Sequence, residues 1–254
     1  MKRFASLCVF ALVACKSKPP EPLRVAAAAD LAHAFAELTP AFTAQTPSDL
    51  KLTSGASGLL ARQLAQGAPF DLFLAANTGY VEQVVKAGAC DGTTAQIYAR
   101  GRLVIWVKGS DGGQLTLASL GDERFKHIAI ADPEHAPYGK AAKEALTRAG
   151  VWATVSGRMV YGENVQQTQQ LVQSGNADAA IVGLSLAVGS PTGSWSLVDE
   201  NAYSPLDQAL VVCKHGTNAG AARKLAEFLK APAGRAILRK YGFLMPGEAL
   251  AVAP

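Results

Sequence analysis

The sequence predicts an α/β protein, because short apolar runs alternate along the chain with segments of helical periodicity. Residues 103–107 form a continuous apolar run, whereas Leu31, Phe35 and Leu38 recur at the spacing of one helix face. Of the 254 residues, 49% are hydrophobic and 17% are charged. This composition supplies enough apolar surface for a folded core and excludes a disordered chain.

Strands and helices are expected in alternation from residue 23 onward, which is typical of parallel sheets whose two faces are covered by helices. The expected strands are 23–29, 50–54, 71–75, 103–107, 127–131, 158–161, 179–184 and 206–213. The expected helices are 31–42, 59–66, 79–87, 117–125, 139–149, 165–174, 219–230 and 233–240.

Two long strands divide the chain into blocks. Residues 103–107 and 206–213 bracket a middle block, and the flanking segments 23–102 and 214–245 would together form a second block. Two α/β lobes joined by two crossing strands, with a cleft between them, would produce this pattern. A single large doubly wound sheet is the alternative, and periodicity does not distinguish the two.

The N-terminus predicts an export signal. A charged start precedes an apolar stretch that is too short to span a bilayer, and residues 12–15 then resemble the bacterial lipobox. We expect 1–14 to be a signal peptide, Cys15 to be lipidated and the proline-rich segment 15–22 to be a tether on the periplasmic side of a bacterial membrane. An ordinary secretory signal with an incidental cysteine is the alternative.

The charge balance argues against a nucleic-acid partner. The chain has 24 Lys and Arg against 20 Asp and Glu, a dispersed formal charge of +4. Cleavage of the signal peptide would remove Lys2 and Arg3 and lower the formal charge from +4 to +2. No stretch reaches the roughly 18 apolar residues of a membrane-spanning helix.

Two cysteines remain in the part of the chain that is expected to fold. An oxidising compartment permits a disulfide between Cys90 and Cys213. Cys213 also ends an apolar run, so a buried free thiol is equally compatible with the sequence. Two cysteines this far apart do not make a metal site. We expect neither a bound metal cation nor a cofactor.

Four turns share a pattern in which small residues precede the start of a helix. They are Ala26–Asp30, Ser54–Gly58, Pro137–Gly139 and Gly162–Val165. Helix N-termini carry free N–H groups and the positive end of the dipole, so they are suited to anions. Asp30, Ser57 and Asn164 are also common N-cap residues, and plain capping is the alternative. The division of the four turns between both blocks favours an anion held between them.

Catalytic motifs are weak. The turn around Ser57 resembles a nucleophile elbow, but its second glycine falls one position early. His135 is the only histidine in a plausible site loop, and it has no recognisable acidic partner. No dinucleotide, P-loop or zinc-protease motif occurs. We therefore expect no enzyme, with a secreted serine hydrolase using Ser57 and His135 as the alternative.

Six motifs, in order, resemble the molybdate-binding proteins of ABC transporters. They are Val25–Leu31, Gly55–Gln63, Gly67–Phe73, Ala131–Gly139, Gly162–Val165 and Arg239–Phe243. The resemblance spans residues 23–244 and implies a type II periplasmic-binding fold, with two interleaved three-layer α/β lobes joined by two crossing strands. Lobe I would comprise 23–103 plus 212–254, and lobe II 104–211. It further implies a monomer that captures molybdate or tungstate in the cleft and delivers it to a membrane permease.

The resemblance also assigns ligand positions. These are Asp30, Ser57, Tyr138 and Val165, with Ala29, Gly58 and Asn164 as possible additions. Ser57 would donate through its hydroxyl and N–H groups, and Val165 through its N–H group. Many members have serine in place of Asp30, whose carboxylate would repel a dianion. We therefore expect the Asp30 side chain to cap its own helix, with only its N–H group facing the ligand.

A second departure concerns the tyrosine that many members have at the position of Gly183. We expect Tyr138 to replace that hydroxyl from the other side of the cleft. A cage of neutral N–H and O–H donors would reject protonated anions, although Asp30 would weaken this rejection as an added acceptor. A receptor for sulfate, phosphonate or a carboxylate is the alternative, and Arg62 and Arg100 are the candidate cations for a carboxylate.

Overall fold

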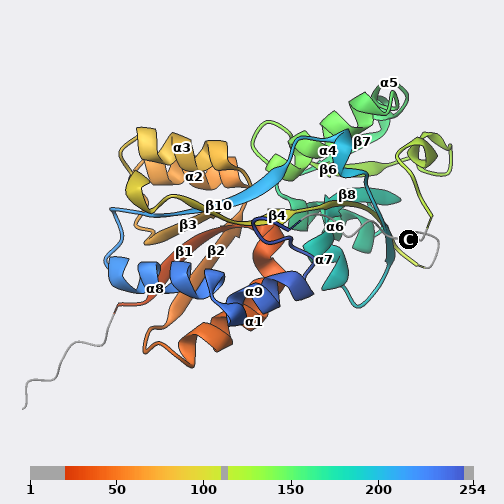
Figure 1. Ribbon diagram of the computed structural model, residues 1–254. Helices are drawn as coiled ribbons and strands as arrows, with labels where there is room; N and C mark the ends of the chain where they lie inside the picture. The colour runs from red at the N-terminus through yellow and green to blue at the C-terminus, as the bar shows by residue number, and fades with distance from the viewer. Residues whose placement is uncertain (1–20, 110–113, 249–254) are drawn as a thin grey trace, which may run out of the picture.

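A computed structural model describes residues 21–109 and 114–248, which form two lobes side by side (Figure 1). The first lobe contains the strands β1 (Leu23–Ala28), β2 (Leu50–Gly55), β3 (Leu72–Ala75), β4 (Gln96–Gly101) and β10 (Leu206–Val212). Its helices are α1 (Ala32–Thr43), α2 (Ser57–Ala65), α3 (Thr78–Lys86), α8 (Ala219–Lys230) and α9 (Pro232–Lys240). The signal peptide and Cys15 lie outside the described residues.

The inner strands β1, β3 and β10 of the first sheet are buried on both faces, whereas most of the edge strand β2 is exposed. Its strand order is β2-β1-β3-β10-β4, and α2 and α3 cover one face while α1, α8 and α9 cover the other (Figure 1). Ala26 and Phe73 pack on the α2–α3 side, whereas Val25 and Leu72 pack on the opposite side. Burial on both faces explains why these strands read as continuous apolar runs.

The second lobe repeats this plan. Its strands are β5 (Leu103–Val107), β6 (Ile128–Ala131), β7 (Met159–Gly162), β8 (Ala179–Gly183) and β9 (Ser194–Leu197), in the order β7-β6-β8-β5-β9. Its helices are α4 (Pro137–Arg148), α5 (Trp152–Val155), α6 (Val165–Gln173) and α7 (Leu184–Val188). Trp106 of β5 is fully buried and belongs to the large core of this lobe.

The two lobes are interleaved, as the sequence predicts. The chain leaves the first sheet at the end of β4 and enters the second at Leu103, then returns to the first sheet at Leu206. Strand β10 pairs with β3 and β4 along its length. Residues 206–211, expected in lobe II, therefore lie in the sheet of lobe I, and Leu103, expected in lobe I, begins β5 of lobe II.

Both sheets are mixed, which corrects the expectation of parallel sheets. Strand β10 runs antiparallel to β3 and β4, and β5 runs antiparallel to β8 and β9. Strands β10 and β5 are the first strands that the chain forms after it crosses from one lobe to the other. A strand that returns from the other lobe is not bound to the βαβ crossover that makes neighbours parallel.

Several local elements differ from those expected. Strands β4 and β9 and helices α5 and α7 were not expected from the sequence. The helix expected at 117–125 is reduced to a 3₁₀ helix, Ala118–Gly121. Thr116 and Ser119 bond to each other's backbone N–H groups there, and Asp122 accepts from the N–H of Arg124. Such side chains compete with the helical hydrogen bonds and shorten the helix.

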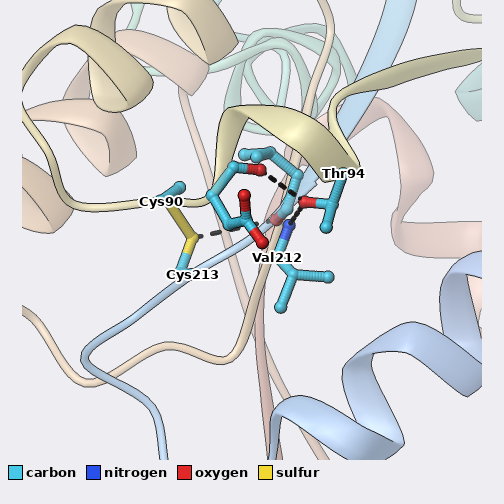
Figure 2. The surroundings of a disulfide bond; sticks show 6 residues. Cys90, Thr94, Val212 and Cys213 are labelled. Atoms are coloured by element: carbon cyan, nitrogen blue, oxygen red, sulfur yellow. Dashed lines mark hydrogen bonds between the residues drawn. A yellow bond between two sulfur atoms is a disulfide. The ribbon is translucent and has the colours of Figure 1, made fainter.

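Cys90 and Cys213 form a disulfide within the first lobe (Figure 2). The two residues also face each other as an antiparallel bridge, and Val212 donates its N–H to Thr94 Oγ1 at 2.9 Å beside them. The bond joins the segment after α3 to the end of β10, on either side of the whole second lobe. The sequence had left this pairing open against a buried free thiol.

Candidate functional site

A small cavity lies between the lobes, with about 10 Å³ open to the centre of a water-sized sphere. From the first lobe it is lined by the turns that follow β1, β2 and β3, and from the second by the first residues of α4 and α6. Of the residues assigned by resemblance, the cavity lining includes Ala29, Asp30, Ser57, Tyr138, Asn164 and Val165. The structure therefore gathers six positions from segments far apart in the sequence into one place.

The start of α4 approaches its own sheet closely, and a glycine makes this possible. A Cβ atom on Gly139 would stand 1.9 Å from the carbonyl oxygen of Ala131 on β6. Any side chain there would push the helix away from the strand. Gly139 thus holds Tyr138, the residue before it, against the cavity.

Ser57 is the first residue of α2 and is buried. Its Oγ accepts a hydrogen bond from the N–H of Ala76 at 3.0 Å. This bond leaves the single hydroxyl hydrogen free to donate to another group. As the first helical residue, Ser57 also has an N–H group without a partner inside the helix. The residue can therefore offer two donors to an anion.

Val165 is the corresponding residue on the second lobe, at the start of α6. Its N–H group has no partner within the helix. The side chain of Asn164 caps this helix, because its Oδ1 accepts from the N–H groups of Gln166 and Gln167. Plain capping is thus the role of the Asn164 side chain, and the N–H group of Val165 is the donor at this end.

Gly58 has a different role from the one expected. Its N–H donates to the carbonyl oxygen of His135 at 2.9 Å, which is a bond between the lobes, and Gly58 is not among the residues that line the cavity. A Cβ atom on Gly58 would lie 2.8 Å from that oxygen. The absence of a side chain therefore permits the two lobes to meet.

Asp30 is fully buried, and its carboxylate is not a helix cap, which corrects the expectation. No side-chain bond caps the 3₁₀ helix Ala29–Leu31. Instead Oδ2 accepts from the Tyr138 hydroxyl at 2.9 Å and from Gln208 Nε2 at 2.8 Å. The Oδ1 atom is buried and has no hydrogen-bond partner. The Asp30 side chain thus links the two lobes.

Burial raises the pKa of Asp30 from 3.8 to about 7, although the hydrogen bonds from Tyr138 and Gln208 and the nearby backbone N–H groups of Asp30 and Leu31 act in the opposite direction. The cause is the loss of water around the charged form. Burial also raises the pKa of Tyr138 well above its ordinary value, and the nearby charge of Asp30 adds to this effect. Tyr138 therefore stays protonated.

Two glycines make room for the Tyr138 side chain. A Cβ atom on Gly183 would lie 3.0 Å from Cε1 of the ring, and one on Gly101 would lie 2.0 Å from the hydroxyl oxygen. Gly183 and Tyr138 both belong to the second lobe, so Tyr138 does not reach the Gly183 position from across the cleft. A tyrosine hydroxyl has a single hydrogen, and here it is donated to Asp30.

The alternatives drawn from the sequence find no matching geometry among the described residues. No hydrogen bond joins Ser57 to His135, whose Nδ1 lies 3.7 Å from Asp132. Arg62 is exposed on α2, and Arg100 pairs with Asp207 at 2.7 Å. Neither arginine lines the cavity. Within residues 21–109 and 114–248, no three His, Cys, Asp or Glu side chains cluster as a metal site, and no helix is long and apolar enough to cross a membrane.

Sequence reasoning missed Gln208, which completes the Asp30 network. Its Nε2 donates to Asp30, and its Oε1 accepts from the Tyr98 hydroxyl at 3.4 Å. The available signal was a polar residue inside an apolar strand. Gln208 is fully buried there, and a buried amide requires partners.

Comparisons with known proteins agree with this geometry. A family model described as bacterial extracellular solute-binding protein matches residues 23–244. The molybdate-binding protein ModA of Rhodobacter capsulatus is 34% identical, over 86% of each chain, and that of Azotobacter vinelandii is 32% identical, over 91% of this chain and 93% of the other.

Solved structures show the same fold. The periplasmic molybdate-binding protein of Azotobacter vinelandii superposes with a TM-score of 0.83 at 28% identity, over 88% of this chain and 99% of the other. The sulfate-binding protein SubI of Mycobacterium tuberculosis shares the fold, with a TM-score of 0.76 at 17% identity over 89% and 87% of the two chains. The chain therefore belongs to the bacterial extracellular solute-binding proteins, in the group that includes the molybdate-binding proteins.

Proposed function

We propose that this protein captures molybdate, and also tungstate, in the cavity between its lobes and delivers it to the permease of an ABC transporter. The observation that carries the proposal is the meeting of two helix N-termini, at Ser57 and Val165, across a cavity whose lining includes no lysine or arginine. Fixed N–H and O–H dipoles can hold a dianion without a cationic side chain. The names of the relatives support molybdate as that anion.

Capture would proceed by closure of the lobes. Donors from both lobes reach the anion at once only when the cleft is closed, so the anion would shift the open–closed equilibrium toward the closed form. The closed form has its own contacts between lobes, including Gly58 to His135 and the Ser185 hydroxyl to the carbonyl oxygen of Asp30 at 2.7 Å. The bound anion would add to these contacts.

The position in the cell follows from the N-terminal sequence. We propose cleavage before Cys15 and lipidation of that cysteine, with residues 15–22 as a tether and the folded part outside the cytoplasm. The protein would act as a monomer and would carry out no catalysis. Mass spectrometry of the protein purified from membranes would detect the lipid on Cys15, whereas an unmodified cysteine would contradict this step.

Calorimetric titration tests the main proposal. The chain without its signal peptide is titrated at pH 6 with molybdate, tungstate, sulfate and phosphate. We expect molybdate and tungstate to bind at one per protein, and sulfate to bind more weakly because it is smaller. Tight binding of sulfate or phosphate with no heat from molybdate would contradict the assignment.

A further inference from the structure

Asp30 belongs to the site that we have assigned to a dianion. Asp30 lines the cavity, is fully buried and leaves Oδ1 without a hydrogen-bond partner. We propose that the site takes up one proton together with the oxyanion, and that Asp30 keeps this proton on Oδ1 and donates a hydrogen bond from it to the anion. This inference rests on the proposed function and adds a proton to the bound state.

The hydrogen bonds of the carboxyl group determine which oxygen carries the proton. Oδ2 already accepts from the Tyr138 hydroxyl and from Gln208 Nε2, so a hydrogen on that oxygen would oppose two donors. Oδ1 accepts no bond and can carry the hydrogen without such a conflict. A protonated Oδ1 becomes a donor, which is the kind of group that a fully ionised oxyanion accepts.

Among the residues that the structure describes, no positive charge lies against Asp30 to stabilise its ionised form beside a dianion. Tyr138 faces it from α4, Tyr98 from β4 and the uncharged Gln208 from β10, and no cation contributes to its pKa. The helices α6 and α7, which also pack near Asp30, contain no charged residue. His33 on α1 packs instead against Gly189.

The titration of Asp30 depends on closure and on the anion. With the lobes together as in this structure, burial outweighs the hydrogen bonds to the carboxyl group and raises its pKa to about 7. A dianion in the cavity would raise that pKa further, because like charges disfavour the ionised form. In an open cleft, water would reach the carboxyl group and lower the pKa. At alkaline pH the protein therefore gains a proton as it binds the anion and closes.

Calorimetry in paired buffers counts this proton. Molybdate is titrated into the chain without its signal peptide at pH 6, 7 and 8.5, in buffers that differ in ionisation enthalpy. We expect close to one proton to be taken up per anion at pH 8.5. The affinity should fall by up to about tenfold for each pH unit above the pKa of free Asp30, as one linked proton requires.

Asp30→Asn provides the matched test. Its amide places a permanent donor where we propose the proton, so the variant should bind molybdate at pH 8.5 at least tenfold more tightly than the natural protein does, with no proton uptake. Glu82→Gln, the same change at an exposed position on α3, should retain the full proton uptake.

Three results would overturn the inference. One is molybdate binding at pH 8.5 without proton uptake by the natural protein, a measurement that does not depend on the folding of any variant. Another is undiminished proton uptake by Asp30→Asn, which would assign the proton to a different group. The third is the absence of molybdate binding at every pH, which would refute the proposed function and this inference together.

Discussion

The cavity combines two sets of residues with different chemistry, which we call its two sides although each set draws on both lobes. One side consists of helix starts, where Ser57 and Val165 offer donors that do not titrate in the ordinary pH range. The other side is a buried network of Asp30, Tyr138 and Gln208 centred on a carboxyl group. The first side is suited to an anion at any pH, whereas the second is suited to it only when Asp30 holds a proton. The helix starts would therefore provide affinity at every pH, whereas the Asp30 network would make that affinity depend on pH.

The two sides also come from the sequence in different ways. The helix starts are local features, since each depends on a small residue and a helix that follow one another in the chain. The acidic network joins residues that are distant in sequence, and Asp30 and Gln208 are 178 positions apart. Of the following substitutions, the first keeps the lobes apart and so affects both sides, and the other two each change one side only.

The largest loss is expected from Gly58→Ala, which acts on both sides. A Cβ atom there would lie 2.8 Å from the His135 carbonyl oxygen, so the lobes could not close completely. Overpacking of this kind costs about 1–3 kcal/mol, and we expect molybdate affinity to fall by up to about a hundredfold. Calorimetry measures the loss. Gly220→Ala, at an exposed helix position with open space around it, is the control. An unchanged affinity for Gly58→Ala would show that closure does not need this contact.

Ser57→Ala tests the side that does not titrate. The substitution removes a hydroxyl donor and leaves the buried N–H of Ala76 without its acceptor. We expect molybdate affinity to fall by about 1–2 kcal/mol, and by the same amount at pH 6 and pH 8.5. Titrations at both values measure this loss. A loss seen at only one pH would mean that Ser57 is coupled to Asp30, and an unchanged affinity would remove Ser57 from the site.

Tyr138→Phe tests the acidic side and should have the smallest effect. Because the bond from the Tyr138 hydroxyl lowers the pKa of Asp30, its loss should raise that pKa. In the closed form Asp30 would then keep its proton to higher pH, whereas the open form, which lacks this bond between the lobes, is unaffected. The decline in affinity should therefore end at a pH higher by less than about one unit. A series of titrations from pH 6 to pH 9 follows the decline. A shift to lower pH would contradict the network described here.

The sequence predicts the strands and the helix starts well, because periodicity and turn residues are local. The small-residue turns before α2 and α6 are predicted in this way, and the resemblance adds the expectation that Ser57 and Val165 bind the anion. The direction of β10 was not predictable, since an apolar run such as 209–212 has no feature that distinguishes a parallel from an antiparallel partner. The role of the Asp30 side chain was not predictable either, because its hydrogen-bond partners are distant in sequence and a helix cap is the only role that its neighbours suggest. Only the fold brings Tyr138 and Gln208 to its carboxylate.

The central claim is that the oxyanion lies in the cavity between the lobes. Crystals of the protein grown with molybdate, measured at the molybdenum absorption edge, would locate the metal atom directly by its anomalous signal. We predict one peak per chain in the cavity, with oxygen atoms within hydrogen-bond distance of Ser57 Oγ, Val165 N and Asp30 Oδ1. A peak only at the protein surface, or a closed cavity that excludes the anion, would contradict the account.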